Sequence, residues 1–135
     1  MPLKIDAAVK CLDDNAEDGS TGLCAKYVRE ALAAGGLAIN PHPVYAKSYG
    51  PFLTVNGFAA VVQKDYVATK GGIAVIQDYP AGVDPATKKA FSASDPAGHI
   101  TMYDGTQWVS DFKQIDMWGG PGYRKHQPDY QAYRP

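Results

Sequence analysis

With 135 residues, the chain is long enough to bury a hydrophobic core, and we expect a single domain over residues 1–135. Its formal net charge is -1 and its Lys and Arg residues are scattered, so it lacks the basic face that nucleic-acid binding requires. The first residues lack the apolar run of a secretory signal, and no segment reaches membrane-spanning length. We therefore expect a protein made in the cytoplasm without a signal peptide, with neither nucleic acid nor a membrane as partner.

A short first helix is predicted at the start of the chain. Ile5, Val9 and Leu12 recur at the spacing of one helical face, and the polar residues that follow predict an end near Asn15.

A second helix follows the polar segment 17–22 and is the better defined of the two. Gly35 and Gly36 supply its C-terminal stop. Its apolar stripe has the spacing of a helix packed into a core and consists of Cys24, Tyr27, Val28, Ala31 and Leu32.

The rest of the chain is rich in residues that favour β-strands. Segment 46–56 predicts a short, proline-interrupted helix closed by Gly57. Segment 79–96 is expected as a surface excursion, and segment 130–134 either adds an edge strand or wraps the surface. Strands that we expect to form one antiparallel sheet cover segments 58–62, 72–77, 99–103 and 107–112. The fold class is therefore α+β, with N-terminal helices packed on a central antiparallel sheet.

Cys24 is the candidate nucleophile. It lies in the first turn of the second helix, where the positive end of the helix dipole can lower the pKa of a thiol. The alternative is a small core residue, since free cysteine is often buried. As a nucleophile, Cys24 would use backbone N–H groups of the helix start, its own included, to stabilise an oxyanion. Ser20 or Thr21 could cap those amides or line the cleft.

His99 is the candidate general base. It follows Gly98 at the start of a predicted strand, from which an imidazole can face a helix packed on the sheet. His42 lies between two prolines in a loop and His126 lies in the polar tail, where exposed histidines are common. The alternative for His99 is a structural residue at a strand edge.

Asp111 is the candidate group that orients the imidazole by accepting a hydrogen bond from it. Ser110 and Asp116 are nearby residues that could accept the same hydrogen bond. A two-residue turn after the strand that starts at His99 would pair His99 with Ser110 and direct Asp111 to the opposite face. Asp111 can therefore orient the imidazole only if the turn has an odd number of residues or a bulge shifts the register.

These segments resemble a known group of enzymes. The sequence 20–28, then 72–75, then 98–105 is similar to the CHAP and NlpC-type cell-wall hydrolases, and in particular to the small amidase effectors of type VI secretion systems. The resemblance implies a papain-like (NlpC/CHAP) fold and hydrolysis of a peptidoglycan amide by Cys24, His99 and Asp111, without cofactor or metal. It also implies injection as an antibacterial toxin that acts in the target-cell periplasm, and a cognate immunity protein. Many relatives have an acidic residue in the strand before the histidine, where this chain has Gly71-Gly72.

Other functions remain open from the sequence. A phage endolysin catalytic domain would use the same residues, a non-catalytic cell-wall-binding module would keep the fold without using Cys24, and a deamidase-type toxin would act on protein side chains. A disulfide between Cys11 and Cys24 would silence the nucleophile in an oxidising periplasm, whereas a buried unpaired Cys11 is the simpler reading.

Overall fold

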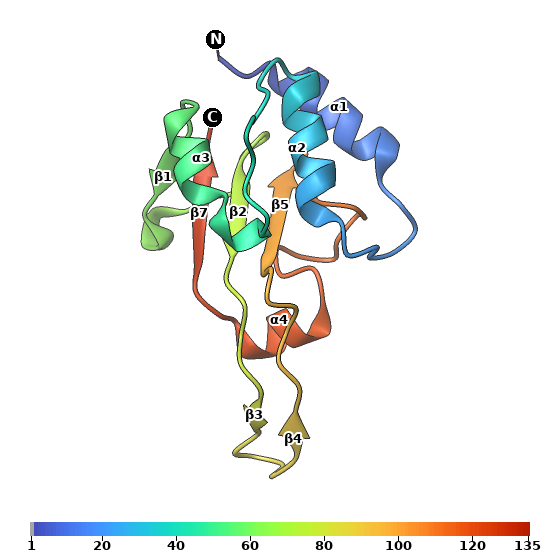
Figure 1. Cartoon of the computed structure of the whole chain (residues 1–135), viewed down its shortest axis with the longest axis vertical. Helices are drawn as coiled ribbons and strands as arrows, with labels where there is room; N and C mark the ends of the chain where they lie inside the picture. The colour runs from blue at the N-terminus through green and yellow to red at the C-terminus, as the bar shows by residue number, and fades with distance from the viewer. Residues whose placement is uncertain (1) are drawn as a thin grey trace.

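The computed structural model describes residues 2–135 and shows helices packed on one face of an antiparallel sheet (Figure 1). The helical elements are α1 (Ile5–Asn15), α2 (Cys24–Ala34), the 3-10 turn η1 (Ala46–Ser48), α3 (Gly50–Val55), the 3-10 turn η2 (Gln63–Asp65) and α4 (Pro121–His126). The strands are β1 (Ala59–Val61), β2 (Ile73–Ile76), β3 (Gly82–Val83), β4 (Ala90–Phe91), β5 (His99–Tyr103), β6 (Trp108–Val109) and β7 (Tyr130–Arg134).

The main sheet has the strand order β1-β7-β2-β5-β6, and every neighbouring pair is antiparallel. The predicted antiparallel sheet is therefore confirmed. Both predicted alternatives for segment 130–134, an edge strand and a surface wrap, are wrong, because β7 lies inside the sheet. Ala132 pairs with Ala74 on one side and with Val61 on the other, so the last strand joins two parts of the chain that are not neighbours in sequence.

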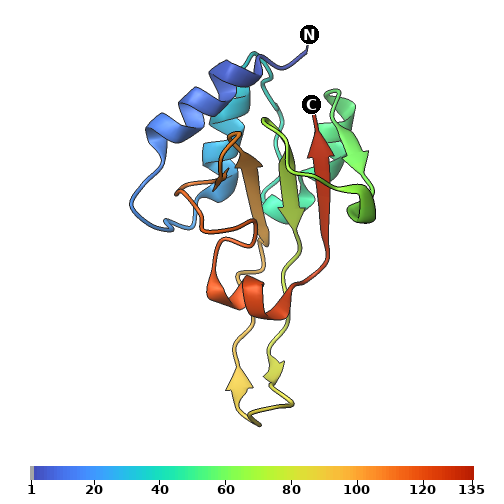
Figure 2. The ribbon, with the colours of Figure 1, turned by 180° about the vertical axis from the view of Figure 1, so that it is seen from behind.

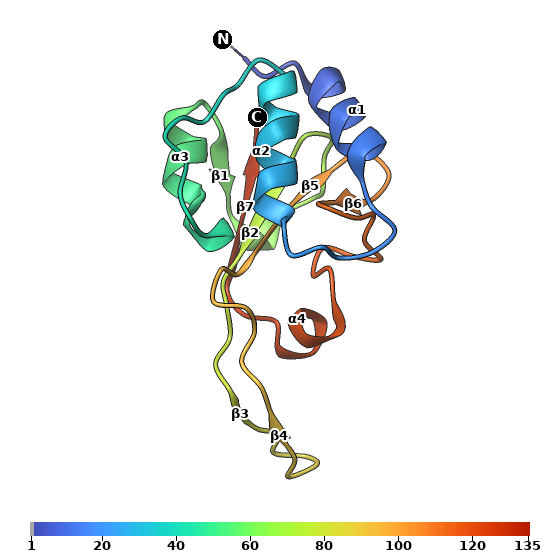
Figure 3. The same ribbon diagram turned by 45° about the vertical axis from the view of Figure 1, so that its right-hand side comes forward.

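Helix α2 covers the face of the sheet that forms the main core (Figure 3). Val28 and Leu32 are fully buried in the same cluster as Val75, Ile100 and Met102 of strands β2 and β5. The apolar stripe predicted from the sequence thus faces the sheet, and burial of side chains of this size stabilises the fold by roughly 1.5–3 kcal/mol each.

The helix ends agree with the sequence patterns. Helix α1 covers Ile5–Asn15, and α2 ends at Ala34, where Gly35 donates its N–H to Ala31 O and Gly36 adopts a φ of 91°. The predicted proline-interrupted helix is present as η1 followed by α3, which has Pro51 in its first turn.

Segment 79–96 forms a hairpin that extends away from one end of the sheet (Figure 2). Only Gly82–Val83 and Ala90–Phe91 pair as strands in it. The N-terminal end of α2 and the start of β5 lie at the same end of the sheet as this hairpin, whereas both chain termini lie at the opposite end (Figure 1). Cys24 and His99, which begin these two elements, are thereby placed at one end of the molecule. Within residues 2–135, no helix has the length and apolar character that crossing a membrane would need.

Candidate active site

Cys24 is the first residue of α2 and lies half-buried against β5. Burial raises the pKa of its thiol to about 11, and the charge of Asp111 raises it further. Hydrogen bonds from the backbone of Ile100 and Ala25 oppose this change without reversing it. The predicted lowering of the thiol pKa by the helix N-terminus is therefore wrong, since burial outweighs it. At neutral pH the thiol keeps its proton and needs a base to become a nucleophile.

The start of α2 carries no side-chain cap. Leu23 is the N-cap residue, and the first intrahelical hydrogen bond runs from Tyr27 N to Leu23 O at 3.2 Å. The predicted capping by Ser20 or Thr21 is wrong, because the helix start has no side-chain hydrogen bond at this position. Its first backbone N–H groups, including that of Cys24, have no intrahelical acceptor and are available to a developing oxyanion.

His99 has a defined partner, Gln114. The distance between His99 Nε2 and Gln114 Oε1 is 2.8 Å. Burial lowers the pKa of His99 below its usual value, while the Gln114 hydrogen bond and the charge of Asp111 act in the opposite direction. The imidazole is therefore neutral at pH 7, which is the form that can accept a proton.

The orientation of Gln114 decides which nitrogen of His99 carries the hydrogen. Gln114 Nε2 donates to Asp116 O at 2.9 Å and to Met117 O at 3.2 Å, so its Oε1 faces the imidazole as an acceptor. His99 Nε2 must then be the donor, and Nδ1 of the neutral ring carries the free lone pair. Gln114 thus fixes the tautomer that leaves Nδ1 able to take up a proton.

Asp111 does not bond to His99. Its Oδ2 accepts hydrogen bonds from Thr21 N at 2.5 Å and Thr21 Oγ1 at 2.8 Å, and its Oδ1 accepts one from Ser110 Oγ at 3.0 Å. Burial alone would raise the pKa of Asp111, but the hydrogen bonds from Thr21 and Ser110 hold it below its usual value. Asp111 is therefore a charged anchor for the loop that leads into Cys24.

The predicted strand 107–112 is shorter than expected, which explains the position of Asp111. Tyr103 pairs with Trp108, so the turn contains the four residues 104–107, and strand β6 stops at Val109. The chain then reverses through residues 110–112, with Ser110 N bonded to Phe112 O at 3.0 Å. Because of this reversal Gln114 returns alongside β6, with its N–H bonded to Trp108 O at 2.8 Å.

Gln114 and Gly119 are site residues that sequence reasoning missed. Gln114 is almost fully buried, at 3% exposure. Gly119 has a φ of 80°, and a Cβ there would come within 2.8 Å of His99 Nε2. Its glycine leaves room for the imidazole and its partner. For these two residues the sequence offers one signal, the pair Gly119-Gly120. Without the fold, nothing in the sequence indicates that residue 114 lies beside residue 99.

Tyr123 of α4 is a third residue that the sequence did not indicate. Its ring centroid lies 5.9 Å from that of His99, and burial raises the pKa of its hydroxyl, with the charge of Cys24 acting in the same direction. The hydroxyl is buried, lies near Ser94 and makes no hydrogen bond to any residue in the described part of the chain. Tyr123 therefore places a buried polar group beside His99.

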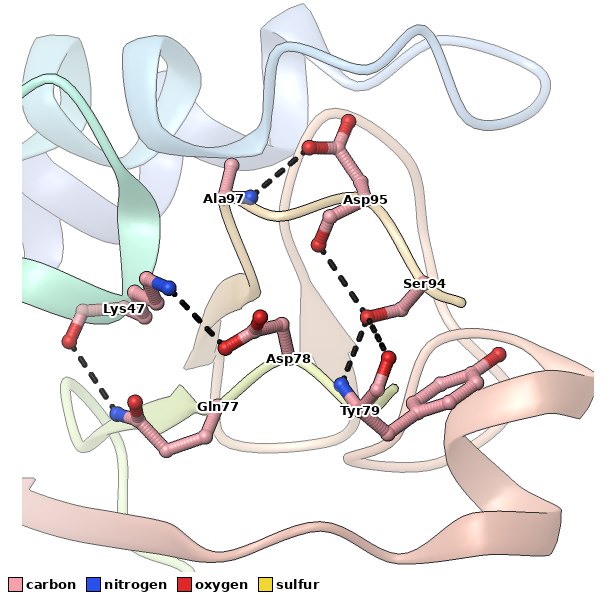
Figure 4. A network of polar contacts seen from close by, with 7 residues as sticks. All are labelled: Lys47, Gln77, Asp78, Tyr79, Ser94, Asp95 and Ala97. Carbon is pink, nitrogen blue, oxygen red and sulfur yellow. Dashed lines mark hydrogen bonds and ion pairs between the residues drawn. The ribbon is translucent and has the colours of Figure 1, made fainter. Parts of the chain in front are cut away.

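The hairpin base fixes the segment that leads into His99 (Figure 4). Lys47 Nζ pairs with Asp78 Oδ1 at 3.1 Å, and Lys47 N donates to Ala97 O at 2.8 Å. Gly98 has a φ of 70°, and a Cβ there would collide with Ile76 O. The approach to His99 is thus tied to η1 and β2 and admits no side chain at residue 98.

Both cysteines are free thiols. Cys11 Sγ lies 3.9 Å from the backbone oxygen of Glu30. Glu30 is about 1.7 turns further along α2 than Cys24. The structure therefore contains no disulfide between Cys11 and Cys24.

Comparison with known proteins identifies close structural matches. No family model matches the chain, and no curated protein matches it. The native type VI effector–immunity complex Tae3–Tai3 from Ralstonia pickettii contains a chain that is 36% identical, with a TM-score of 0.78, over 97% of this chain and 98% of that one. The selenomethionine form of the same complex gives 37% identity and a TM-score of 0.76, over 95% of this chain and 99% of that one.

The fold and the site define an α+β protein with a cysteine at a helix start beside a histidine on a central strand. By its identity and near-complete coverage, the chain belongs to the type VI effector family represented by Tae3. The predicted resemblance to type VI amidase effectors is thereby confirmed.

Proposed function

We propose that this protein is a papain-like cysteine amidase that hydrolyses an amide bond in the peptides of peptidoglycan. The arrangement of His99 carries the proposal. Its Nε2 is held by Gln114 and its Nδ1 is left as the free base, on the strand against which Cys24 lies. The neutral thiol of Cys24 needs such a base to become a nucleophile. A thiol nucleophile together with a neutral imidazole base is suited to acyl transfer.

In the first half of the reaction, His99 Nδ1 takes the proton of Cys24 as Sγ attacks the carbonyl carbon of the amide. The carbonyl oxygen becomes an oxyanion that the backbone N–H of Cys24 stabilises. The C–N bond then breaks, His99 gives the proton to the leaving amine, and a thioester on Cys24 remains.

In the second half, His99 Nδ1 takes a proton from a water molecule that attacks the thioester. The C–S bond breaks, the carboxylic acid leaves, and the proton returns to the Cys24 sulfur. Gln114 Oε1 accepts the Nε2 hydrogen throughout and keeps the ring in place.

Asp111 contributes to this reaction from a distance. Its charge favours the imidazolium that forms when the thiol loses its proton, because it acts to raise the pKa of His99. Its hydrogen bonds to Thr21 also fix the loop before Cys24. The proposed role of Asp111 is therefore electrostatic and positional, and Gln114 takes the orienting role.

The family supports a role as an antibacterial toxin. The related Tae3 was crystallised as a type VI effector–immunity complex with Tai3. We propose that this chain is likewise injected into a competing cell, acts in its periplasm, and has a cognate immunity protein in the cell that makes it.

The test is digestion of purified peptidoglycan, with mass spectrometry of the soluble fragments. The wild type and the matched control Cys11→Ala are expected to release the same defined muropeptides, and Cys24→Ala none. The fragment masses then name the bond. Equal release by Cys24→Ala would overturn the proposal, and a wild type that cuts nothing would favour a non-catalytic wall-binding module.

A further inference from the structure

A cationic pocket lies beside the nucleophile. It has a volume of about 170 Å³ and lies between the start of α2 and the segment before η1, with Ala97 of the hairpin base at its edge. Its lining includes Cys24, Lys26, Arg29 and His42 and contains no acidic residue.

Arg29 is held in this pocket by neutral groups. Its Nη1 donates to Tyr49 Oη at 3.0 Å, and Tyr49 is fully buried. Among the residues that the structure describes, no carboxylate pairs with Arg29, whereas Lys10, Lys47, Lys70, Arg124 and Lys125 have such partners. The guanidinium is thus positioned by one nitrogen and keeps its other N–H donors free.

His42 does not satisfy Arg29 either. His42 Nδ1 lies 3.0 Å from Pro43 O, which requires a hydrogen on that nitrogen, so it cannot also accept a hydrogen bond from Arg29 Nη1 at 3.5 Å. The pocket therefore presents N–H donors and positive charge with no anion to neutralise them.

We infer that this pocket binds a carboxylate of the substrate peptide, with Arg29 as its specificity-determining residue. The inference rests on the proposed function, since it names the chemistry of a group next to the scissile amide. Arg29 binds a carboxylate through two parallel hydrogen bonds, and the exposed Lys26, which also lines the pocket, adds charge. A carboxamide at the same place would direct its own N–H donors at the N–H donors of Arg29, so fewer hydrogen bonds could form.

The test compares two muropeptides that are identical except at one carboxyl group. This group is free in the first muropeptide and amidated in the second. The comparison is repeated for each carboxyl group of the peptide. The wild type is expected to prefer one free carboxylate by at least tenfold in kcat/KM. Arg29→Gln is expected to lose that preference, mainly through KM, and Arg29→Lys to keep part of it. Lys64→Gln, which removes an exposed charge remote from the pocket, serves as the control. An unchanged ratio between the two substrates in Arg29→Gln would overturn the inference.

Binding separates this inference from the proposed function. In the Cys24→Ala background, which cannot form a thioester, calorimetry is expected to show weaker binding of the free carboxylate after Arg29→Gln, with a smaller loss after Tyr49→Phe. Such a loss supports the pocket even if the wild type cuts nothing. Binding that is the same with and without Arg29 overturns the pocket even if the wild type cuts peptidoglycan.

Discussion

At the scale of single residues, the tautomer of His99 depends on Gln114. Gln114→Ala removes the acceptor of the Nε2 hydrogen, so the ring can rotate or shift its hydrogen to Nδ1, which must be free to take the thiol proton. We expect kcat/KM to fall by roughly 10²-fold with the fold intact. The measurement is the rate of muropeptide release together with the melting temperature.

Gln114→Glu is the informative companion variant. A carboxylate beside His99 favours the imidazolium, so the pKa of His99 should rise and the acid limb of the pH profile should move to higher pH. Activity would then return at alkaline pH, unlike in Gln114→Ala. If both variants matched the wild type at every pH, Gln114 would have no part in the reaction.

The raised pKa of Cys24 makes a separate prediction about its reactivity. Since burial raises the thiol pKa to about 11, the thiolate fraction at pH 7 is very small and grows about tenfold for each pH unit up to that value. In a Cys11→Ser background, alkylation of Cys24 by iodoacetamide should therefore keep accelerating between pH 7 and pH 10. A rate already constant at pH 7 would show a preformed thiolate and contradict the neutral-pair mechanism.

At the scale of elements, helix α1 meets the turn between β5 and β6 through two carboxyl groups. Burial, and then a hydrogen bond with Asp104, raise the pKa of Asp13 to about 6. Between its ordinary value of 3.8 and about 6, the unfolded chain has released this proton while the folded protein still holds it, so stability falls as pH rises through that window.

Asp13→Asn should remove this penalty. We expect the free energy of unfolding to rise by about 1 kcal/mol at pH 8, after allowance for solvent screening, and to be nearly unchanged at pH 3.5, where the folded protein and most of the unfolded chain hold the Asp13 proton. Denaturant unfolding at the two pH values measures it, with Asp18→Asn at an exposed position as the control. A larger gain at pH 3.5 than at pH 8 would contradict the assignment.

The elements also show which parts of the structure sequence patterns can predict. The stripe on α2 was predictable from its local periodicity, and the strand at His99 from its local run of residues that favour β-strands. The interior position of β7 was not, since its partners lie at Val61 and Ala74, far along the chain. Gln114 was hidden for a similar reason, because only the reversal after Val109 brings it back toward His99.

At the scale of the whole molecule, the hairpin, helix α4 and the active site form one connected end. Phe91 of β4 packs on His126 with ring centroids 4.2 Å apart, and Tyr79 packs on Tyr123 at 5.4 Å. Lys125 also pairs with Asp84 of the hairpin. These contacts hold α4, and with it Tyr123, against His99.

Replacing residues 81–92 by a short turn should therefore separate stability from activity. The main core contains none of these residues, so we expect the fold to persist with only a small loss in melting temperature. Helix α4 loses its contacts with Phe91 and Asp84 but keeps those with Tyr79 and Asp116, so hydrogen exchange in residues 121–126 should accelerate while the helix remains formed. With Tyr123 loosened beside His99, kcat/KM should fall by roughly tenfold.

Tyr123→Phe is the matched control, because it removes only the hydroxyl and leaves the hairpin in place. If the shortened protein kept full activity while α4 exchanged faster, the rigidity of this end would be irrelevant to catalysis.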